Sequence, residues 1–258
     1  MMDFTEAANA LKLGRAVAST MQPSTALNLR KGGTDVRILA AQIWSGNAFL
    51  VRKDAPYKSL ADLRGKKIGN FSRATGAYFF SAVIAKEKGL DIEKDFQSIP
   101  LETGALIALL ERGEVEAINM FEPHVAKLVV SGRFRVLVDF DVELQRIFGT
   151  PPLKTGIGVL KETFDKQPEL VKAIRAAYVD GIKVIKSGQD KDFFESHAKE
   201  LFGLSTPEEI AAGMKRNREN FADVWGGPFF ESQNKILQKG ITLGLLPDVG
   251  NLDDLWIK

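Results

Sequence analysis

The sequence predicts an α/β protein with two lobes, the second lobe inserted into the first. Between residues 67 and 140, short apolar segments alternate with helical patterns, which is typical of a parallel-rich α/β sheet. Two breaks at prolines, Pro56 and Pro151–Pro152, flank this region and are the expected crossings between lobes. The chain after residue 160 is helical, and these C-terminal helices are assigned to lobe one. Lobe one is therefore expected to comprise residues 1–55 and 153–258, and lobe two residues 56–152.

The first part of lobe one shows short elements separated by glycine and proline. Apolar residues share one face of a predicted helix over 4–13, which Gly14 ends. A strand is expected over 15–19, and a polar loop over 20–24 then leads into a helix that ends at Gly32–Gly33. Strands over 36–41 and 47–52 are separated by a predicted loop over 42–46.

Lobe two opens with a buried strand over 67–71, followed by a polar loop and a helix. Thr75 and Ser72 are both candidate N-caps of this helix, and Gly89 is placed just after its C-terminus. Further strands are predicted over 96–101, 114–120 and 134–140. A helix over 104–110 and a second helix with Pro123 at its first position lie between them.

The C-terminal part has one strand, over 156–160, followed by helices. Apolar residues every three or four positions predict a helix that begins at Pro168. Thr206 and Glu209 form a predicted capping box with Pro207 at the first helical position. A last helix is expected over 229–240.

Composition excludes several classes of function. The 258 residues are 45% hydrophobic and 26% charged, as in a globular protein, and the net charge of +2 is too small to indicate a nucleic-acid or membrane-surface partner. Without cysteine there is no disulfide, thiolate metal site or cysteine nucleophile. The two histidines, His124 and His197, are too far apart in sequence to favour a zinc site or a catalytic triad. We therefore expect neither a metal nor a cofactor.

The loop between the strand over 67–71 and the following helix is a candidate anion site. The first turn of a helix has unpaired N–H groups and the positive end of the helix dipole, and both attract anions. Ser72 and Thr75 supply hydroxyl groups there, and Arg73 supplies a planar cation with five donors. The alternative is that both hydroxyls only cap the helix and that Arg73 is a solvated loop residue.

Four segments resemble the solute-binding proteins of ABC importers, of the nitrate, sulfonate and taurine type. Residues 59–69 (SLADLRGKKIG) resemble the opening of that family's second lobe, and residues 113–123 (GEVEAINMFEP) resemble its "G.vDAi…wEP" segment. Two further segments resemble the same family: residues 7–18, and the tail formed by 243–247 and 252–255. All four segments occur in the order and at the spacing found in that family. The resemblance covers nearly the whole chain.

The resemblance implies a two-lobed fold of the type II periplasmic-binding-protein class that closes on a small solute. It also implies binding without catalysis, an ABC permease as partner, and a periplasmic or extracytoplasmic location. The solute would be a small anion such as a sulfonate, nitrate or taurine, held in a cleft between the lobes.

Carried onto matching positions, the resemblance places ten ligand-binding residues in four loops. They are Ser19, Thr20, Met21, Gln42, Trp44, Ser72, Arg73, Thr75, Asn119 and Glu122. Arg73 and the hydroxyls would hold the anionic head, and Trp44 would be an apolar wall or a packed aromatic at the crossing. Glu122 would accept from an amine on the ligand, repel a second carboxylate, or simply lie beside the dipole of the helix that follows it.

Two features depart from the family. Its members carry an export signal and a first strand–helix unit before the segment that matches residue 7 onward, and residues 1–6 show no signal peptide. We expect the sheet position of that strand to be open, and a homodimer would be one way to compensate for it. The second departure is Arg15, where the family often has Asp.

Two other functions remain open. Small biosynthetic enzymes that act on pyrimidines or aromatic acids share this fold, but among the expected binding loops only Glu122, with His124 nearby, offers acid–base chemistry. A cytoplasmic ligand-sensing domain is the other alternative. The sequence does not distinguish between the candidate anions.

Overall fold

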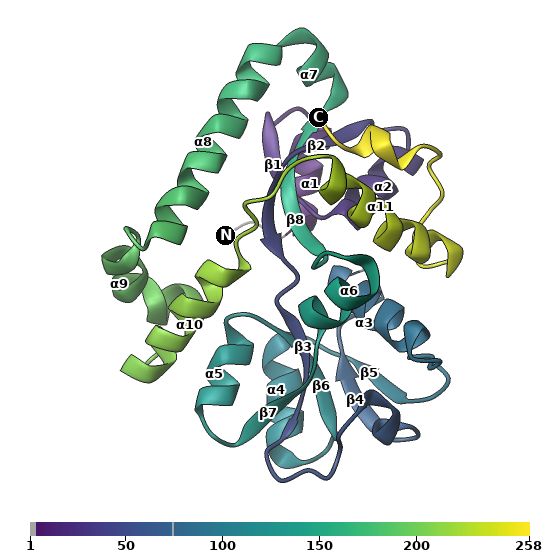
Figure 1. The fold of residues 1–258 in the computed structure, drawn as a ribbon, viewed down its shortest axis with the longest axis vertical. Coiled ribbons are helices and arrows are strands. Elements are labelled where there is room, and N and C mark those ends of the chain that lie inside the picture. The colour runs from purple at the N-terminus through teal and green to yellow at the C-terminus, as the bar shows by residue number, and fades with distance from the viewer. Residues whose placement is uncertain (1–3, 74) are drawn as a thin grey trace. The chain divides into compact units, whose positions relative to one another are not determined.

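The computed structural model describes residues 4–73 and 75–258, and their contacts form two compact units (Figure 1). Unit 1 contains the described residues up to Trp44, with Phe148–Ser187 and Phe221–Lys258. Unit 2 contains Ser45–Ile147 and Gly188–Asn220. These units differ from the lobes expected from sequence, because residues 45–55 and 188–220 pack with unit 2 and residues 148–152 with unit 1. The lobe boundaries themselves stay a prediction.

Unit 1 is built on a three-stranded sheet with the order β1-β8-β2, and both pairings are antiparallel. The strands are β1 (Ala18–Met21), β2 (Val36–Trp44) and β8 (Leu153–Leu160). Its helices are α1 (Phe4–Lys12), α2 (Pro23–Lys31), α7 (Lys161–Lys166), α8 (Pro168–Ser187) and α11 (Gly227–Thr242), with a short 3-10 helix at Leu252–Leu255.

Two glycines of β8 let its neighbours approach closely. A Cβ atom on Gly156 would lie 2.5 Å from Cγ2 of Ile38 on β2, and a Cβ atom on Gly158 would lie 2.8 Å from Cβ of Met21 on β1. Their missing side chains therefore make room for the buried residues of the outer strands. The apolar face between this sheet and α8 is made of Leu39, Ala40, Ile157, Val159, Val171 and Ile257.

Unit 2 has a five-stranded mixed sheet with the order β5-β4-β6-β3-β7. The strands are β3 (Asn47–Arg52), β4 (Lys67–Asn70), β5 (Gln97–Pro100), β6 (Ala117–Phe121) and β7 (Phe134–Asp139). Strand β4 pairs in parallel with β5 and β6, whereas β3 pairs antiparallel with β6 and β7. The helices are α3 (Gly76–Glu87), α4 (Thr103–Arg112), α5 (His124–Val130), α6 (Phe140–Phe148), α9 (Lys191–Phe202) and α10 (Pro207–Asn220), with a 3-10 helix at Leu60–Leu63.

The helix pair α9 and α10 belongs to unit 2, where α10 packs against α5. The Nζ atom of Lys127 on α5 donates to the carbonyl of Gly203, 2.6 Å away, in the turn between α9 and α10. A small apolar cluster of Phe194, Ala198 and Leu204 joins α9 to α10. The C-terminal helices are thus divided between the two units.

Several local predictions are confirmed. Thr75 is the N-cap of α3, Gly89 follows its C-cap with φ 71°, and the Thr206–Glu209 capping box opens α10 at Pro207. These signals depend on neighbouring residues only, so the sequence alone is sufficient for them.

Other predictions are wrong, because tertiary pairing decides them. The sheet predicted to be parallel-rich over 67–140 is mixed, because β3 lies between β6 and β7 and pairs antiparallel with both. The predicted loop over 42–46 is strand up to Trp44, because β8 and a bridge between Ile43 and Phe221 extend β2. Helix α5 begins at His124, with Pro123 as its N-cap, and α6 was not predicted.

Among residues 4–73 and 75–258, no helix is both long enough and apolar enough to cross a membrane.

Candidate functional site

In unit 2, the predicted anion loop joins the end of β4 to the start of α3. The Thr75 hydroxyl accepts from the backbone N–H of Tyr78 at 3.2 Å and donates to the carbonyl of Ser72 at 2.8 Å. Its hydrogen-bonding capacity is therefore used to cap α3. Ser72 is exposed, and its carbonyl helps to hold the loop in this turn.

Arg73 is exposed and stacks over the ring of Tyr78, with 5.7 Å between the guanidinium carbon and the ring centroid. Burial and a hydrogen bond to Glu93 raise the pKa of Tyr78, so the phenol stays neutral beneath the cation. Within the described part of the chain, no carboxylate lies within ion-pair distance of Arg73. The guanidinium is positioned by the ring and its charge is available to a solute.

Asn119 is fully buried in a ladder of asparagines across three strands. Its side-chain oxygen accepts from Asn47 on β3 at 3.0 Å, and its amide nitrogen donates to Asn70 on β4 at 2.9 Å and to the Ala77 carbonyl at 3.0 Å. Asn70 in turn donates to Ser81 of α3 at 3.0 Å. Both N–H donors of Asn119 have protein partners, so in this structure it fixes α3 to the ends of β4 and β6.

Glu122, also predicted to bind ligand, lies just before α5 and is held by protein groups. Its side chain is 3% exposed, and one carboxylate oxygen accepts from Nε of Arg216 on α10 at 2.7 Å. The other oxygen accepts from the backbone N–H of Ala126 at 3.1 Å. Burial raises the pKa of Glu122 above its usual range, although Arg216 opposes the shift.

Arg216 is the centre of an acidic cluster at the junction of α10 and α5. Besides Glu122, its guanidinium approaches Asp139 at 3.7 Å and Glu219 at 3.2 Å. Burial is the largest single effect and lowers the pKa of Arg216, but the bond to Glu122 and the charges of Glu122, Asp139 and Glu219 together outweigh it, and the net shift is upward. The cluster attaches α10 to unit 2 through charge as well as packing.

In unit 1, a polar network joins two of the predicted residues, Thr20 and Gln42, to two residues that were not predicted, Thr155 and Tyr178. The Thr155 hydroxyl of β8 donates to Oε1 of Gln42 on β2 at 2.9 Å, and Nε2 of Gln42 donates to the hydroxyl of Tyr178 on α8 at 3.0 Å. Burial raises the pKa of Tyr178, and a hydrogen bond with Thr20 of β1 opposes the shift. The network connects β1, β2, β8 and α8.

The direction of these hydrogen bonds leaves the O–H group of Tyr178 without an acceptor within the Thr155–Gln42–Tyr178 chain. Because Thr155 donates to the oxygen of Gln42, the amide nitrogen of Gln42 faces Tyr178, whose oxygen accepts. The O–H of Tyr178 then remains as a donor, because a bond with Thr20 that opposes the rise in the pKa of Tyr178 is one in which Thr20 donates. In the sequence, Tyr178 is the one hydroxyl-bearing residue among the aliphatic residues of the apolar stripe of its helix. This pattern is the feature of the sequence that could have identified it as a polar residue of the site.

The other three predicted residues of unit 1 differ in exposure. Met21 is 1% exposed and packs against Gly158. Ser19 is half-buried, and its hydroxyl donates to the Thr20 carbonyl at 3.3 Å. Trp44 is half-buried, and its ring centroid lies 6.1 Å from that of Phe229, also in unit 1.

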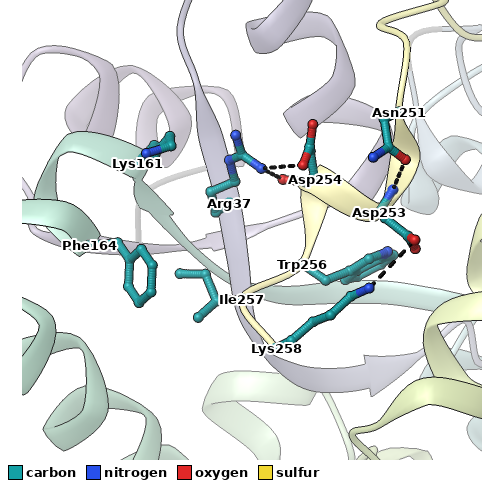
Figure 2. Close-up of a pocket in the computed structure, with 9 residues that line it drawn as sticks. All are labelled: Arg37, Lys161, Phe164, Asn251, Asp253, Asp254, Trp256, Ile257 and Lys258. Atoms are coloured by element: carbon teal, nitrogen blue, oxygen red, sulfur yellow. Dashed lines mark hydrogen bonds and ion pairs between the residues drawn. The ribbon is translucent and has the colours of Figure 1, made fainter.

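A cavity of about 420 Å³ lies beside the C-terminal tail of unit 1 (Figure 2). Arg37 donates to the carbonyl of Asp254 and to Asp35, while Lys258 pairs with Asp253 at 3.5 Å. These charges neutralise one another. They fix the tail, whose Ile257 N–H donates to the carbonyl of Ile38 on β2, rather than present a free charge to a solute.

Solved structures share this fold. The periplasmic aliphatic sulphonate binding protein SsuA from Escherichia coli matches 95% of this chain and 81% of its own, with 16% identity and a TM-score of 0.78. The alkanesulfonate-binding protein SsuA from Xanthomonas axonopodis pv. citri, bound to MOPS, matches 97% and 83% with 15% identity and a TM-score of 0.76. The desulfurization enzyme DSZB matches 93% and 83% with 18% identity and a TM-score of 0.62. No curated protein sequence matches the chain.

The likeness to these structures establishes the fold, which is the two-lobed type II periplasmic-binding-protein fold predicted from the sequence. Identities this low establish the fold and do not by themselves identify the solute. The family model for the periplasmic substrate-binding protein of phosphonate ABC transporters matches residues 1–197, which is more than half of the chain. The protein therefore belongs to that family of ABC-transporter periplasmic substrate-binding proteins.

Proposed function

We propose that the protein binds a small organic oxyanion, of the sulfonate type, and delivers it to the import permease of an ABC transporter outside the cytoplasm. Membership of the substrate-binding family supports the transport role. Two proteins of the same fold are sulfonate-binding proteins, one of them bound to MOPS, which supports a tetrahedral oxyanion as the solute.

The observation that carries the proposal is the environment of Arg73. Its guanidinium is exposed, rests on the neutral ring of Tyr78, and has no carboxylate partner among the described residues, directly before the N-terminus of α3. A planar guanidinium forms paired hydrogen bonds to two oxygens of an oxyanion. The N–H groups at the start of α3 add favourable partial charge.

In unit 1, considered by itself, the hydroxyl of Tyr178 is a second candidate donor to an oxyanion. The O–H of Tyr178 is directed by the Thr155–Gln42 pair, and a neutral O–H can donate to a sulfonate oxygen. Burial raises the pKa of Tyr178, so the proton is retained at neutral pH. Asn119 acts indirectly, by fixing α3 to the end of β4, whereas Glu122 fixes α10 to the start of α5.

Isothermal titration calorimetry with ethanesulfonate, taurine, methylphosphonate, nitrate and an aminopyrimidine tests the proposal. We expect a sulfonate to bind and Arg73→Ala to weaken it by about 10-fold to 100-fold, the cost of losing a charged hydrogen-bond partner. Arg64→Ala is the matched control, because Arg64 is also in unit 2, is 60% exposed, and already pairs with Asp95 at 2.7 Å.

The outcomes separate the alternatives. Equal affinity in the wild type and in Arg73→Ala would rule out the Arg73 site, and binding of the aminopyrimidine alone would rule out the oxyanion. The desulfurization enzyme has the same fold, so sulfite release from each sulfonate is measured in the same samples. Turnover would replace the transport proposal with an enzymatic one.

A further inference from the structure

A second cavity in unit 1, of about 540 Å³, lies between α8 and the segment 222–225 that leads into α11. None of its residues is among the ten predicted ligand contacts. Its lining consists of Ala40, Ala41, Arg175, Val179, Ile182, Lys183, Lys186, Ser187, Ala222, Asp223, Val224 and Trp225. All of these residues belong to unit 1.

The inner wall of this cavity is apolar and fixed in place. Ala40, Ala41, Ile182 and Ala222 are buried, while Val224 at 48% exposure marks the side toward solvent. The segment that carries the outer wall is pinned to β2, because the N–H of Ala222 donates to the Gln42 carbonyl at 2.8 Å and Phe221 forms a bridge to Ile43. The cavity is therefore preformed, which lowers the cost of ordering on binding.

Trp225 forms a rigid aromatic wall. Its ring packs against Phe229, Phe230 and Trp256, with centroids 5.4, 4.9 and 5.9 Å away. Its indole N–H donates to the Ile257 carbonyl at 3.1 Å. With its polar atom satisfied inside the protein, the indole offers only apolar surface and π-electrons to an occupant.

The charge of the cavity is positive. The Arg175 guanidinium lies 5.5 Å from the Trp225 ring centroid, and within the described residues no carboxylate is within ion-pair distance of it. Lys186 pairs with Asp223 at 3.0 Å, and Lys183 pairs with Asp180 at 2.9 Å, where both side chains are about 70% exposed and the attraction is weak. Arg175 is thus the cation left for a ligand.

We propose that this cavity is a separate binding site for a small aromatic anion, a flat ring that carries one sulfonate or carboxylate group. The ring would lie on the Ala40–Ala41 floor beside Trp225, and the anionic group would form paired hydrogen bonds with Arg175. Apolar walls and one uncompensated guanidinium match a ligand with one charge and an apolar body. Such a site is independent of Arg73 in unit 2.

Calorimetric titration with naphthalene-1-sulfonate tests this site. Methanesulfonate has the charge without the ring, and naphthalene-1-methanol has the ring without the charge. Arg175→Gln retains most of the side-chain stem, and Val224→Glu places a carboxylate at an exposed position of the lining. The matched control is Lys172→Gln, because Lys172 is on the same helix, is 70% exposed, and lies outside the cavity.

We expect naphthalene-1-sulfonate to bind, and both Arg175→Gln and Val224→Glu to weaken it by about tenfold or more, as for loss or repulsion of one charged contact. Lys172→Gln and Arg73→Ala should leave the affinity unchanged. Retained affinity in Arg175→Gln would overturn the proposal, as would absence of binding by cooperatively folded wild-type protein. Loss in Arg73→Ala but not in Arg175→Gln would assign the probe to the unit 2 loop instead, which also overturns it.

Discussion

Arg73 and Glu122 were both predicted to contact the ligand, yet their environments in unit 2 are opposite. Arg73 is exposed, with its charge uncompensated by the described residues, whereas the side chain of Glu122 is 3% exposed and bound to Arg216 at 2.7 Å. A charge without a protein partner can be neutralised by a solute, and a paired one cannot without breaking the pair. In the proposed function, Arg73 therefore has a binding role and Glu122 a positioning role.

Glu122 should make stability depend on pH. Its pKa in the folded protein is raised above the usual 4.5, mainly by burial, so between pH 4.5 and the folded pKa the native protein binds more protons than the unfolded chain. The free energy of unfolding contributed by this residue should therefore fall as pH rises through that window, and Glu122→Gln should remove the effect. Urea denaturation at a series of pH values measures it.

Glu219→Gln is the control for this prediction, because Glu219 also approaches Arg216, at 3.2 Å, but is 50% exposed. The stability difference between wild type and Glu122→Gln should shrink as pH rises from 4.5, and the Glu219→Gln difference should change less. A difference that grows with pH would show that pairing with Arg216, not burial, dominates Glu122.

Tyr178 and Thr155 should be energetically coupled through Gln42. Tyr178→Phe leaves the amide nitrogen of Gln42 without its acceptor, and Thr155→Val leaves its oxygen without a donor, so each should cost about 1–3 kcal/mol. In a double-mutant cycle by urea denaturation, we expect the two costs to be non-additive by at least about 0.5 kcal/mol. Strict additivity would contradict the network.

At the scale of elements, the sheet of unit 1 depends on the glycines of β8. Gly156→Ala would place Cβ 2.6 Å from the Ala40 carbonyl and 2.5 Å from Cγ2 of Ile38. Since the carbonyl belongs to the backbone of β2 it cannot turn aside, and we expect a loss of about 1–3 kcal/mol in the free energy of unfolding. Chemical denaturation gives the value.

Gly181→Ala provides the comparison for that substitution. Gly181 is within α8, and a Cβ atom there would have no neighbour within 4 Å. Alanine is a better helix former than glycine, so this variant should gain about 0.5–1 kcal/mol. If Gly156→Ala were as stable as Gly181→Ala, β8 would not be as tightly packed between β1 and β2 as described.

At the scale of the whole molecule, solute binding should appear as thermal stabilisation. A ligand present at about 100 times its dissociation constant adds about 2.7 kcal/mol to the folded state. For 258 residues this corresponds to a rise of several degrees in Tm, by the size scaling of about 2–4 °C per kcal/mol. Differential scanning calorimetry at increasing sulfonate concentration checks the logarithmic dependence. A constant Tm, with binding seen by titration, would indicate binding to the unfolded chain as well.

Features whose causes are local could be predicted from the amino-acid sequence alone. Thr75, Gly89 and the Thr206–Glu209 box mark helix ends through hydrogen bonds and backbone angles within a few residues, and the structure confirms them. The two-lobed α/β class was also predicted correctly, because alternating strands and helices and the order of four motifs extend over the whole chain. The ten ligand contacts stay a prediction.

Features that depend on residues distant in sequence could be recognised only once the chain is folded. Glu122 meets Arg216 94 positions later, Gln42 meets Thr155 113 positions later, and β8 returns between β1 and β2 to make an antiparallel sheet. The same applies to α9 and α10, which pack with unit 2 although the chain order suggested lobe one. Hydrogen-bond partners and buried charges are chosen by packing in three dimensions, which periodicity along one chain does not encode.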